Sequence, residues 1–286
     1  MLREIRALGF AWAELSHGIR ISLLPGIIEA VEAGEMKISS LHNFCPLPLG
    51  VNHAAPNLFL FSSEDRRERE NAWRHSLKTI ETAARLHAQA VVLHLGRVEM
   101  KEYTERLLEM LHRGLKDSPK YAALREEALE KREKKKERYM ELTCEFLGRL
   151  AVVAGQNGVK LGIENRQALE EIPPDSDLEL LLLQFNRPEI GYWHDCGHAQ
   201  IKENLGVLNH RQHLESLAPR LLGLHVHDVQ YPGRDHRAPG SGIIDFAALK
   251  PMLKPEHIKV FELSPSLAPE DVAAGVVFVK ECWGEG

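Results

Sequence analysis

The chain has 286 residues, 44% of them hydrophobic, and a formal net charge of −5 at pH 7. This composition is sufficient for one large core, and the negative charge excludes a general electrostatic attraction to nucleic acid, although a local basic patch stays open. Four cysteines without CxxC spacing indicate free thiols in a reducing compartment. Because no run of about 18 apolar residues and no signal-peptide core is present, we expect a cytoplasmic protein without a membrane segment.

Short apolar runs of strand length alternate with helical stretches along the chain. The expected strands are 11–16, 37–43, 90–95, 159–164, 191–195, 222–227 and 259–263. The stretch 64–87 shows the spacing of a helix, with Trp73, Leu77, Ile80 and Ala84 on one face. Apolar strands that alternate with amphipathic helices predict a parallel sheet covered by helices, and therefore an α/β fold.

The number of expected strands is seven, whereas a closed parallel barrel has eight. Residues 2–10 are typical of the end of a helix that leads through Gly9 into the strand 11–16. We therefore predict a (β/α)8-type TIM barrel that lacks its first strand in this chain, built as a single domain over residues 1–286. A strand hidden within the first dozen residues is the alternative.

The longest interval between expected strands runs from residue 96 to 158. It contains a dense run of mixed charges at 125–138, with acidic and basic residues at spacings that permit i,i+4 pairs. We expect a long charged helical insertion at about 100–156, with the run exposed to solvent. An arm that binds nucleic acid would be more uniformly basic.

Four residues that can ligate a metal stand at the ends of four successive expected strands. They are Glu164, Asp195, His225 and Glu262. The carboxyl ends of parallel strands converge on one face of a barrel, so these side chains should meet although they are far apart in the sequence. Two glutamates, an aspartate and a histidine form a hard, mostly oxygen ligand set. Such a set suits a divalent ion, namely Mn²⁺, Mg²⁺, Co²⁺ or Zn²⁺.

Further polar residues are expected on the same face. They are His42 and His94 at strand ends, His198 three residues after Asp195, and His236 in a turn-rich loop. These additional histidines leave the number of ions open, from one to three, and make substrate contacts as reasonable as ligation. Trp12 and Glu14 are candidate substrate contacts from the first visible strand. Packing for Trp12 and a solvent-facing or capping role for Glu14 are the alternatives.

Other polar residues near these strand ends have expected supporting roles. Asn165 and Asp228 directly follow strand-end residues and should orient ligands. His227 alternates with His225, so it should point away from the barrel interior and be structural, unless the alternation is out of phase. His194, His210 and His213 are expected at the surface or as supporting groups.

The ordered motifs at these positions resemble those of a known superfamily. They are Gly162-Ile-Glu-Asn165, His194-Asp-Cys-Gly-His198, His225-Val-His-Asp228, Asp235-His-Arg-Ala-Pro-Gly-Ser-Gly242 and Phe261-Glu-Leu263. The set is similar to the xylose isomerase-like TIM-barrel superfamily, which includes sugar-phosphate isomerases and epimerases and endonuclease IV-like nucleases. Its epimerase branch implies one metal held by Glu164, Asp195, His225 and Glu262. The two glutamates would then act as the acid/base pair, and His198 would bind a sugar oxygen.

The resemblance makes a metal-dependent isomerase or epimerase of a small sugar or polyol derivative the favoured function. The endonuclease branch implies a phosphodiesterase for abasic DNA that also uses His42, His94, His198 and His236, with an aspartate two residues before His236. Arg234 occupies that position, and no concentrated basic loop is present. A keto-sugar lyase or dehydratase would need the same proton abstraction, and a barrel that only binds sugar or metal is a further alternative. We expect a carbohydrate partner rather than nucleic acid or membrane, and leave a homo-oligomer open.

Overall fold

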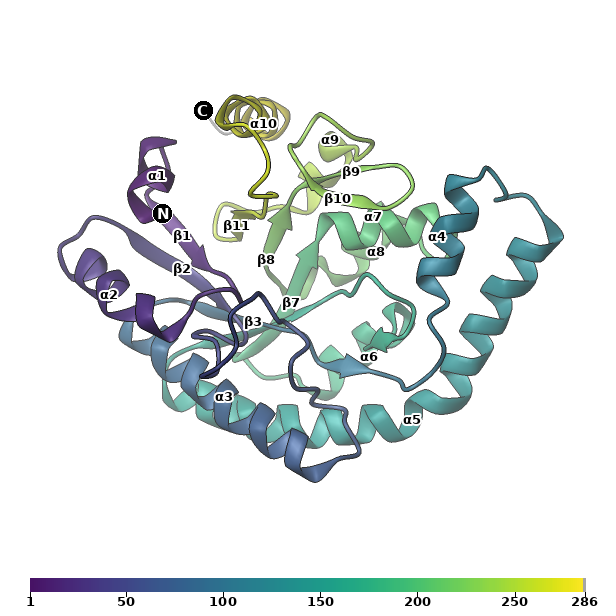
Figure 1. The fold of residues 1–286 in the computed structure, drawn as a ribbon, viewed down its shortest axis with the longest axis horizontal. Helices are drawn as coiled ribbons and strands as arrows, with labels where there is room; N and C mark the ends of the chain where they lie inside the picture. Colours follow the sequence, from purple (N-terminus) through teal and green to yellow (C-terminus); the bar gives the residue numbers. More distant parts are fainter. Residues whose placement is uncertain (285–286) are drawn as a thin grey trace. The chain divides into compact units, whose positions relative to one another are not determined.

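The computed structural model describes residues 1–284 and contains the expected alternation of strands and helices (Figure 1). The helices are α1 (Leu2–Ala7), α2 (Leu24–Glu32), α3 (Arg66–Arg85), α4 (Thr104–His112), α5 (Pro119–Gln156), α6 (Asp175–Gln184), α7 (Cys196–Asn204), α8 (His210–Leu217), α9 (Phe246–Leu249) and α10 (Pro269–Trp283). The strands are β1 (Trp12–Leu15), β2 (Lys37–His42), β3 (Ala90–Leu93), β4 (Gly96–Arg97), β5 (Lys160–Glu164), β6 (Glu171–Ile172), β7 (Ile190–Asp195), β8 (Leu221–Val226), β9 (Asp228–Gln230), β10 (Arg234–Arg237) and β11 (Ile258–Phe261). All seven expected strands are present.

Backbone contacts divide the chain into two compact units. Unit 1 comprises residues 1–97, 138–164 and 182–191, and unit 2 comprises residues 98–137, 165–181 and 192–286. Strand β7 runs through the boundary, and the seven expected strands share one sheet order, β1-β2-β3-β5-β7-β8-β11. The registered pairs of this sheet are parallel. The α/β class with a parallel sheet is thus confirmed, and the single domain stays a prediction.

In unit 1, helix α3 packs on β2 and β3 through a buried face whose positions recur every three or four residues. Asp65 directly precedes the helix, and its carboxylate accepts a hydrogen bond from the backbone N–H of Arg67 at 2.8 Å and so caps the first turn. The C-terminal part of α5, which belongs to the same unit, runs beside α3 in Figure 1. Phe146 of α5 contacts Trp73 of α3 at 5.6 Å between ring centroids.

The charged run at 125–138 is helical, as predicted, and carries i,i+4 ion pairs such as Lys131 with Glu127. The insertion expected at about 100–156 stays a prediction. Beyond the charged run, α5 buries Leu142, Phe146 and Leu150. These residues have the spacing of one helix face, so the end of α5 is part of the packed helical layer of unit 1.

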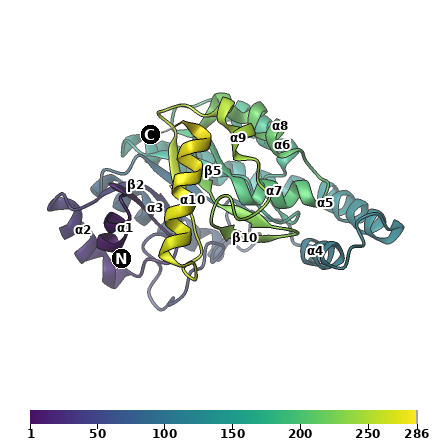
Figure 2. The same ribbon diagram turned by 90° about the horizontal axis from the view of Figure 1, so that it is seen from above.

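In unit 2, helix α7 begins directly at the end of β7 and contacts α8, which in turn contacts α9 (Figures 1 and 2). The antiparallel pair β9–β10 was not expected from the sequence. The loop after β10 is fastened by Asp228, whose carboxylate accepts hydrogen bonds from the backbone N–H groups of Val229, Gly240, Gly242 and Ile244 at 2.8–3.1 Å. Asp228 therefore orients this loop.

Residues 2–7 form helix α1, and no strand precedes β1 in the described part of the chain. Within residues 1–284, the only sheet neighbour of β1 is β2, with Trp12 opposite Lys37 and Glu14 opposite Ser40. The assignment of the N-terminal segment as a helix that leads into the first visible strand is thus confirmed.

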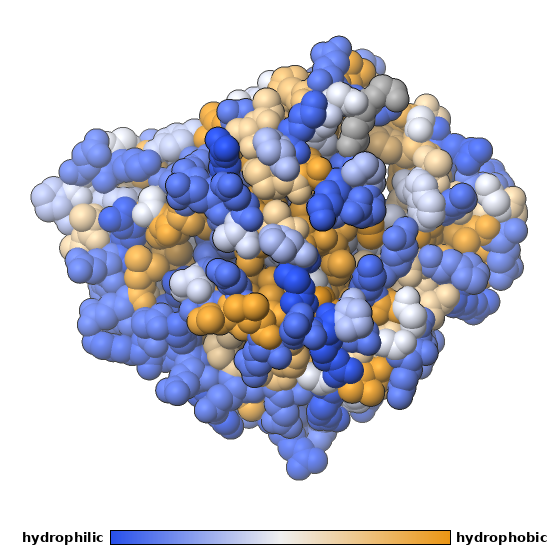
Figure 3. Space-filling view, turned by 180° about the vertical axis from the view of Figure 1, so that it is seen from behind, coloured by the Kyte–Doolittle hydropathy of each residue, from blue (hydrophilic) through white to orange (hydrophobic). Residues whose placement is uncertain are grey.

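Hydrophilic residues cover most of the molecular face drawn in Figure 3, and hydrophobic residues form separate groups between them. None of the helices in the described part of the chain combines the length and the apolar character needed to cross a membrane.

Candidate metal centre

In unit 1, three of the expected site residues lie together at strand ends. His42 ends β2, Glu164 ends β5, and His94 directly follows β3. The Nε2 atoms of His94 and His42 lie 2.8 and 3.4 Å from Glu164 Oε2. The parallel register explains this convergence, because His42 is paired with Val92 and Val92 with Gly162. Side chains two residues apart on a strand share a face, so His94 and Glu164 lie on the face of His42.

The hydrogen bonds of the two imidazoles fix the positions of their protons. Nδ1 of His42 lies 3.0 Å from the backbone oxygen of Asn43, and Nδ1 of His94 lies 2.9 Å from Oδ1 of Asn57. Both oxygens can only accept, so each Nδ1 carries a hydrogen and each Nε2 is the atom turned towards Glu164. Two imidazole Nε2 atoms that converge on a carboxylate, with each Nδ1–H anchored behind, form the arrangement of a metal site. The unit 1 group therefore fits a divalent cation.

A second group lies in unit 2, at the ends of the neighbouring strands β7, β8 and β11. Nδ1 of His225 lies 3.0 Å from Glu262 Oε2 and 3.5 Å from Asp195 Oδ2. Asp195 is paired with His225, and His225 with Val260. Glu262 stands two residues beyond Val260 and so faces the same side. Asp195 and His225 are completely buried, whereas 24% of the Glu262 side chain is exposed and can meet a bound molecule.

Asn165 holds the backbone that carries Asp195. Its Oδ1 accepts the N–H of Asp195 at 2.7 Å, and its Nδ2 donates to the carbonyl oxygen of Asp195 at 3.0 Å. The Asp195 carboxylate in turn accepts the backbone N–H of His198 at 2.7 Å and so caps α7. Burial disfavours the charged carboxylate, but the neighbouring His198 and His227 lower the pKa of Asp195 well below its ordinary value. Asp195 is therefore ionised and available as a ligand.

The expectation that His227 points away from the site is wrong. Its Nε2 lies 3.1 Å from both carboxylate oxygens of Asp195, and its Nδ1 accepts the backbone N–H of His236 at 3.0 Å. Burial disfavours the imidazolium, but the charge of Asp195 outweighs this effect and raises the pKa of His227. The alternation fails because β8 ends at Val226, so His227 lies between two strands rather than within one. His227 thus belongs to the group around Asp195.

His236 covers His227 and extends the unit 2 group. The two rings are parallel within 3°, with their centroids 4.4 Å apart. Nδ1 of His236 lies 3.0 Å from Asp235, and its Nε2 lies 3.8 Å from Glu262. Burial opposes protonation, but the bonds to Asp235 and Glu262 raise the pKa of His236 to about 11.

The two candidate substrate contacts on β1 differ in their surroundings. Trp12 is 45% exposed, with the Lys37 ammonium 5.1 Å from the ring centroid. The Glu14 carboxylate accepts a hydrogen bond from the Ser40 hydroxyl at 2.7 Å, and Ser40 stands two residues before His42 on the same face of β2. Glu14 therefore lies in the row of side chains that leads to His42. Substrate contact by either residue stays a prediction.

Comparison with known proteins identifies the family. Residues 2–281 match the model described as xylose isomerase-like TIM barrel. The chain belongs to this family. No curated protein matches the chain in sequence.

Solved structures share the fold of this xylose isomerase-like chain. A D-tagatose 3-epimerase-like protein is 17% identical, with a TM-score of 0.71 over 99% of this chain and 91% of its own. The 3-keto-D-glucoside 4-epimerase YcjR from E. coli is 16% identical, with a TM-score of 0.69 over 98% and 93% of the two chains. The TTHB071 protein from Thermus thermophilus, soaked with ZnCl₂, is 24% identical, with a TM-score of 0.64 over 100% and 93%. The predicted TIM-barrel fold is thus confirmed.

The residues that the superfamily resemblance assigns to one metal are divided between the units. Asp195, His225 and Glu262 lie in unit 2, whereas Glu164 lies in unit 1 with His42 and His94. Each unit by itself therefore presents converging donor atoms. The four-residue ligand set stays a prediction.

Proposed function

We propose that this chain is a divalent-metal-dependent isomerase or epimerase of a small sugar or polyol derivative. The observation that carries the proposal is the group of Asp195, His225 and Glu262, in which two carboxylates lie within 3.5 Å of one imidazole nitrogen. Glu164 would complete the ligand set. The sugar epimerases with the same fold support a carbohydrate substrate.

The bound ion would polarise a substrate carbonyl and stabilise the enediolate that forms beside it. Glu262 is suited to move the proton, because its carboxylate is partly exposed while His225 holds one of its oxygens. It would take the proton from the carbon next to the carbonyl and become a carboxylic acid. For isomerisation, that proton returns to the neighbouring carbon. For epimerisation, a second acid delivers a proton to the opposite face, and we assign this role to Glu164.

The test combines metal analysis with a screen of keto-sugars in D₂O. We expect deuterium to enter the carbon beside the carbonyl of a turned-over sugar, and the Glu262→Gln variant to lose at least about 100-fold in kcat, as expected for a removed general base. Glu256→Gln is the matched control, because Glu256 lies exposed before β11 whereas Glu262 follows it. Full activity of Glu262→Gln would exclude the proposed base. Loss of water from the product would instead indicate a lyase.

A phosphodiesterase that acts on abasic DNA is the second candidate, favoured by the His42–His94–Glu164 group. A one-metal epimerase does not need the two histidines of this group as ligands. A pair of ions, in contrast, stabilises both the attacking and the leaving oxygen when a phosphate ester is cleaved. Against this function, Asp235 is engaged with His236, and Arg234 occupies the position two residues before His236. Cleavage of an oligonucleotide with one abasic site, lost in His94→Gln and accompanied by more than one ion per chain, would favour the nuclease.

A further inference from the structure

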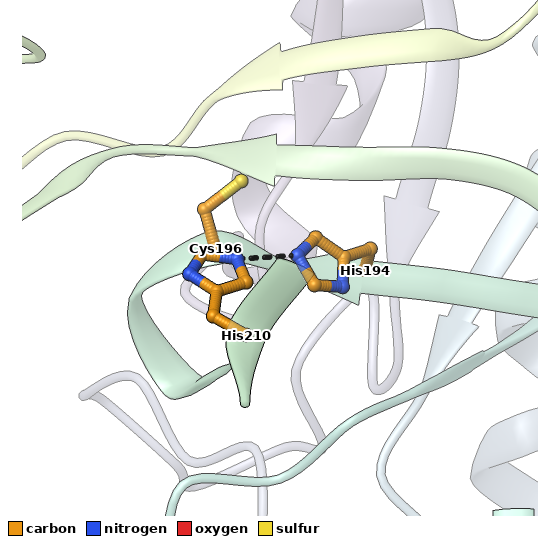
Figure 4. A group of neighbouring side chains, drawn as sticks. All are labelled: His194, Cys196 and His210. Atoms are coloured by element: carbon orange, nitrogen blue, oxygen red, sulfur yellow. Dashed lines mark hydrogen bonds between the residues drawn. The ribbon is translucent and has the colours of Figure 1, made fainter. Parts of the chain in front are cut away.

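Unit 2 contains a second cluster of potential ligands, separate from the candidate metal centre. It consists of His194 on β7, Cys196 at the first position of α7 and His210 at the first position of α8 (Figure 4). Their ligand atoms lie within 4.8 Å of one another, and the three residues are buried. The Nε2 atoms of the two histidines face each other at 3.0 Å.

The proton on His194 is fixed by a chain of hydrogen bonds. Asn165 Oδ1 accepts the backbone N–H of Asp195, so this atom is the amide oxygen. The hydroxyl of Tyr192 donates its only hydrogen to that oxygen at 3.0 Å. Tyr192 must therefore accept from Nδ1 of His194, which lies 2.7 Å away. His194 thus carries its hydrogen on Nδ1 and presents a lone pair at Nε2.

The same reasoning fixes His210. The side-chain nitrogen of Gln200 donates to the carboxylate of Glu203 at 3.1 Å and to Asn204 Oδ1 at 3.2 Å, so the orientation of the amide is set. The Gln200 oxygen then faces Nδ1 of His210 at 3.3 Å and accepts its hydrogen. His210 therefore also presents a lone pair at Nε2.

Two lone pairs that face each other at 3.0 Å repel unless a cation lies between them. This cation can be a second hydrogen on one ring, which would occupy the two nitrogens alone, or a metal ion, which would also have the sulfur of Cys196 within reach. A metal ion satisfies both nitrogens at once. The Nδ1–H groups of the two histidines already donate to Tyr192 and Gln200. Histidines that bind a metal through one ring nitrogen usually donate the hydrogen of the other nitrogen in this way.

We propose that His194, His210 and Cys196 bind a thiophilic transition-metal ion, either Zn²⁺ or Cu⁺, at a site distinct from the candidate metal centre. Nitrogen and thiolate sulfur are the donors that both ions prefer. Binding replaces the thiol hydrogen of Cys196, which leaves to solvent as a proton, and the thiolate offsets one positive charge of the buried ion. Metal–nitrogen distances of about 2.0–2.1 Å and a metal–sulfur distance of about 2.3 Å can be reached by a side-chain rotation of Cys196, because the three ligand atoms already lie within 4.8 Å of one another.

The first test is titration of the purified, metal-free chain with Co²⁺, a spectroscopic substitute for Zn²⁺. We expect a thiolate-to-cobalt absorption band in the wild type and in His213→Gln, and no such band in Cys196→Ser or His210→Gln. His213 is the matched control because it lies one turn further along α8 and faces Asp175 at 3.9 Å. The oxygen and imidazole donors of the candidate metal centre give no thiolate band, so the two sites are distinguishable.

A second measurement does not depend on the folding of a variant. X-ray absorption of the wild type, loaded in parallel with Zn²⁺ and with Cu⁺ under reducing conditions, should show one sulfur ligand per ion at this site, and the tighter-binding ion identifies the occupant. Gln200→Leu should weaken binding by about 10- to 100-fold, because the Nδ1–H of His210 loses its acceptor. The absence of a thiolate band and of a sulfur ligand with either ion would overturn the proposal. It would indicate that His194 and His210 share a proton instead of a metal ion.

Discussion

Replacing Gly197 with alanine should displace His227 from Asp195. Gly197 is the second residue of α7, and a Cβ atom at this position would lie 2.1 Å from Cε1 and 2.6 Å from Nδ1 of His227. His227 is completely buried, and its ring also stacks on His236. The ring must therefore move as a whole, and its two 3.1 Å contacts with the Asp195 carboxylate cannot be kept.

The cost follows from three opposing effects. Overpacking of a buried position costs about 1–3 kcal/mol, and loss of a hydrogen bond to a charged group costs about 1.5–3 kcal/mol. Alanine in place of glycine within a helix stabilises the folded state by about 1 kcal/mol. We therefore expect Gly197→Ala to lower the free energy of unfolding by about 1.5–5 kcal/mol.

The measurement is urea unfolding followed by circular dichroism. Gly148→Ala is the matched control, because Gly148 lies inside α5 and its Cβ would first meet Phe185 at an ordinary 3.4 Å. This variant should be unchanged or more stable by about 0.5–1 kcal/mol. In a His227→Ala background, Gly197→Ala should lose its cost because the clashing ring is gone. Equal stability of Gly197→Ala and Gly148→Ala in the wild-type background would refute the reasoning.

Three further predictions concern unit 2 and α3. Asp228→Asn should lower the free energy of unfolding by about 1.5–3 kcal/mol, because the charged acceptor of four backbone N–H groups is lost. Amide hydrogen exchange in the 238–244 loop, measured by mass spectrometry, should become faster. Lys202 is completely buried, and its ammonium lies 2.7 Å from the Asp175 carboxylate, so Lys202→Met leaves that carboxylate without its cation. The free energy of unfolding in urea should fall by about 3 kcal/mol, and the added change Asp175→Asn should restore part of this loss. Burial lowers the pKa of His75 in the folded chain, so below about pH 6.5 the unfolded chain binds more protons and the free energy of unfolding falls. His75→Phe should therefore flatten this part of the curve of stability against pH. An unchanged slope would contradict the prediction.

Much of the fold and part of the candidate site could be predicted because both depend on strand periodicity. Side chains alternate along a strand, and parallel register carries this alternation to the next strand. The meeting of His42, His94 and Glu164 in unit 1 follows from these two rules. The same holds for His225 and Glu262 in unit 2. The apolar runs also marked the seven strands to within two residues at each end.

The residues that the sequence placed incorrectly lie where periodicity stops. His227 follows the last residue of β8, and its direction is set by the β9–β10 pair, which has no strong apolar signal. For His194 and His210, which were expected at the surface or as supporting groups, only the surface alternative is wrong, because the two residues are buried against each other. Their contact depends on how α8 packs on α7, a tertiary feature that no local pattern reports.

The end of β7 links the candidate metal centre to the proposed thiolate site. Asp195 is flanked by His194 and Cys196. The side chain of Asp195 lies next to His225, whereas the side chains of the two flanking residues lie next to His210. An ion held by both flanking residues would restrict the backbone angles of Asp195 and thus the position of its carboxylate. We therefore expect Cys196→Ser to weaken Mn²⁺ binding at the candidate metal centre by about 10-fold, at the lower end of effects from groups behind a ligand. Calorimetric titration of wild type and variant, each with and without Zn²⁺ preloaded, would measure this. Equal Mn²⁺ affinity in all four samples would show that the backbone of Asp195 is held without the second ion.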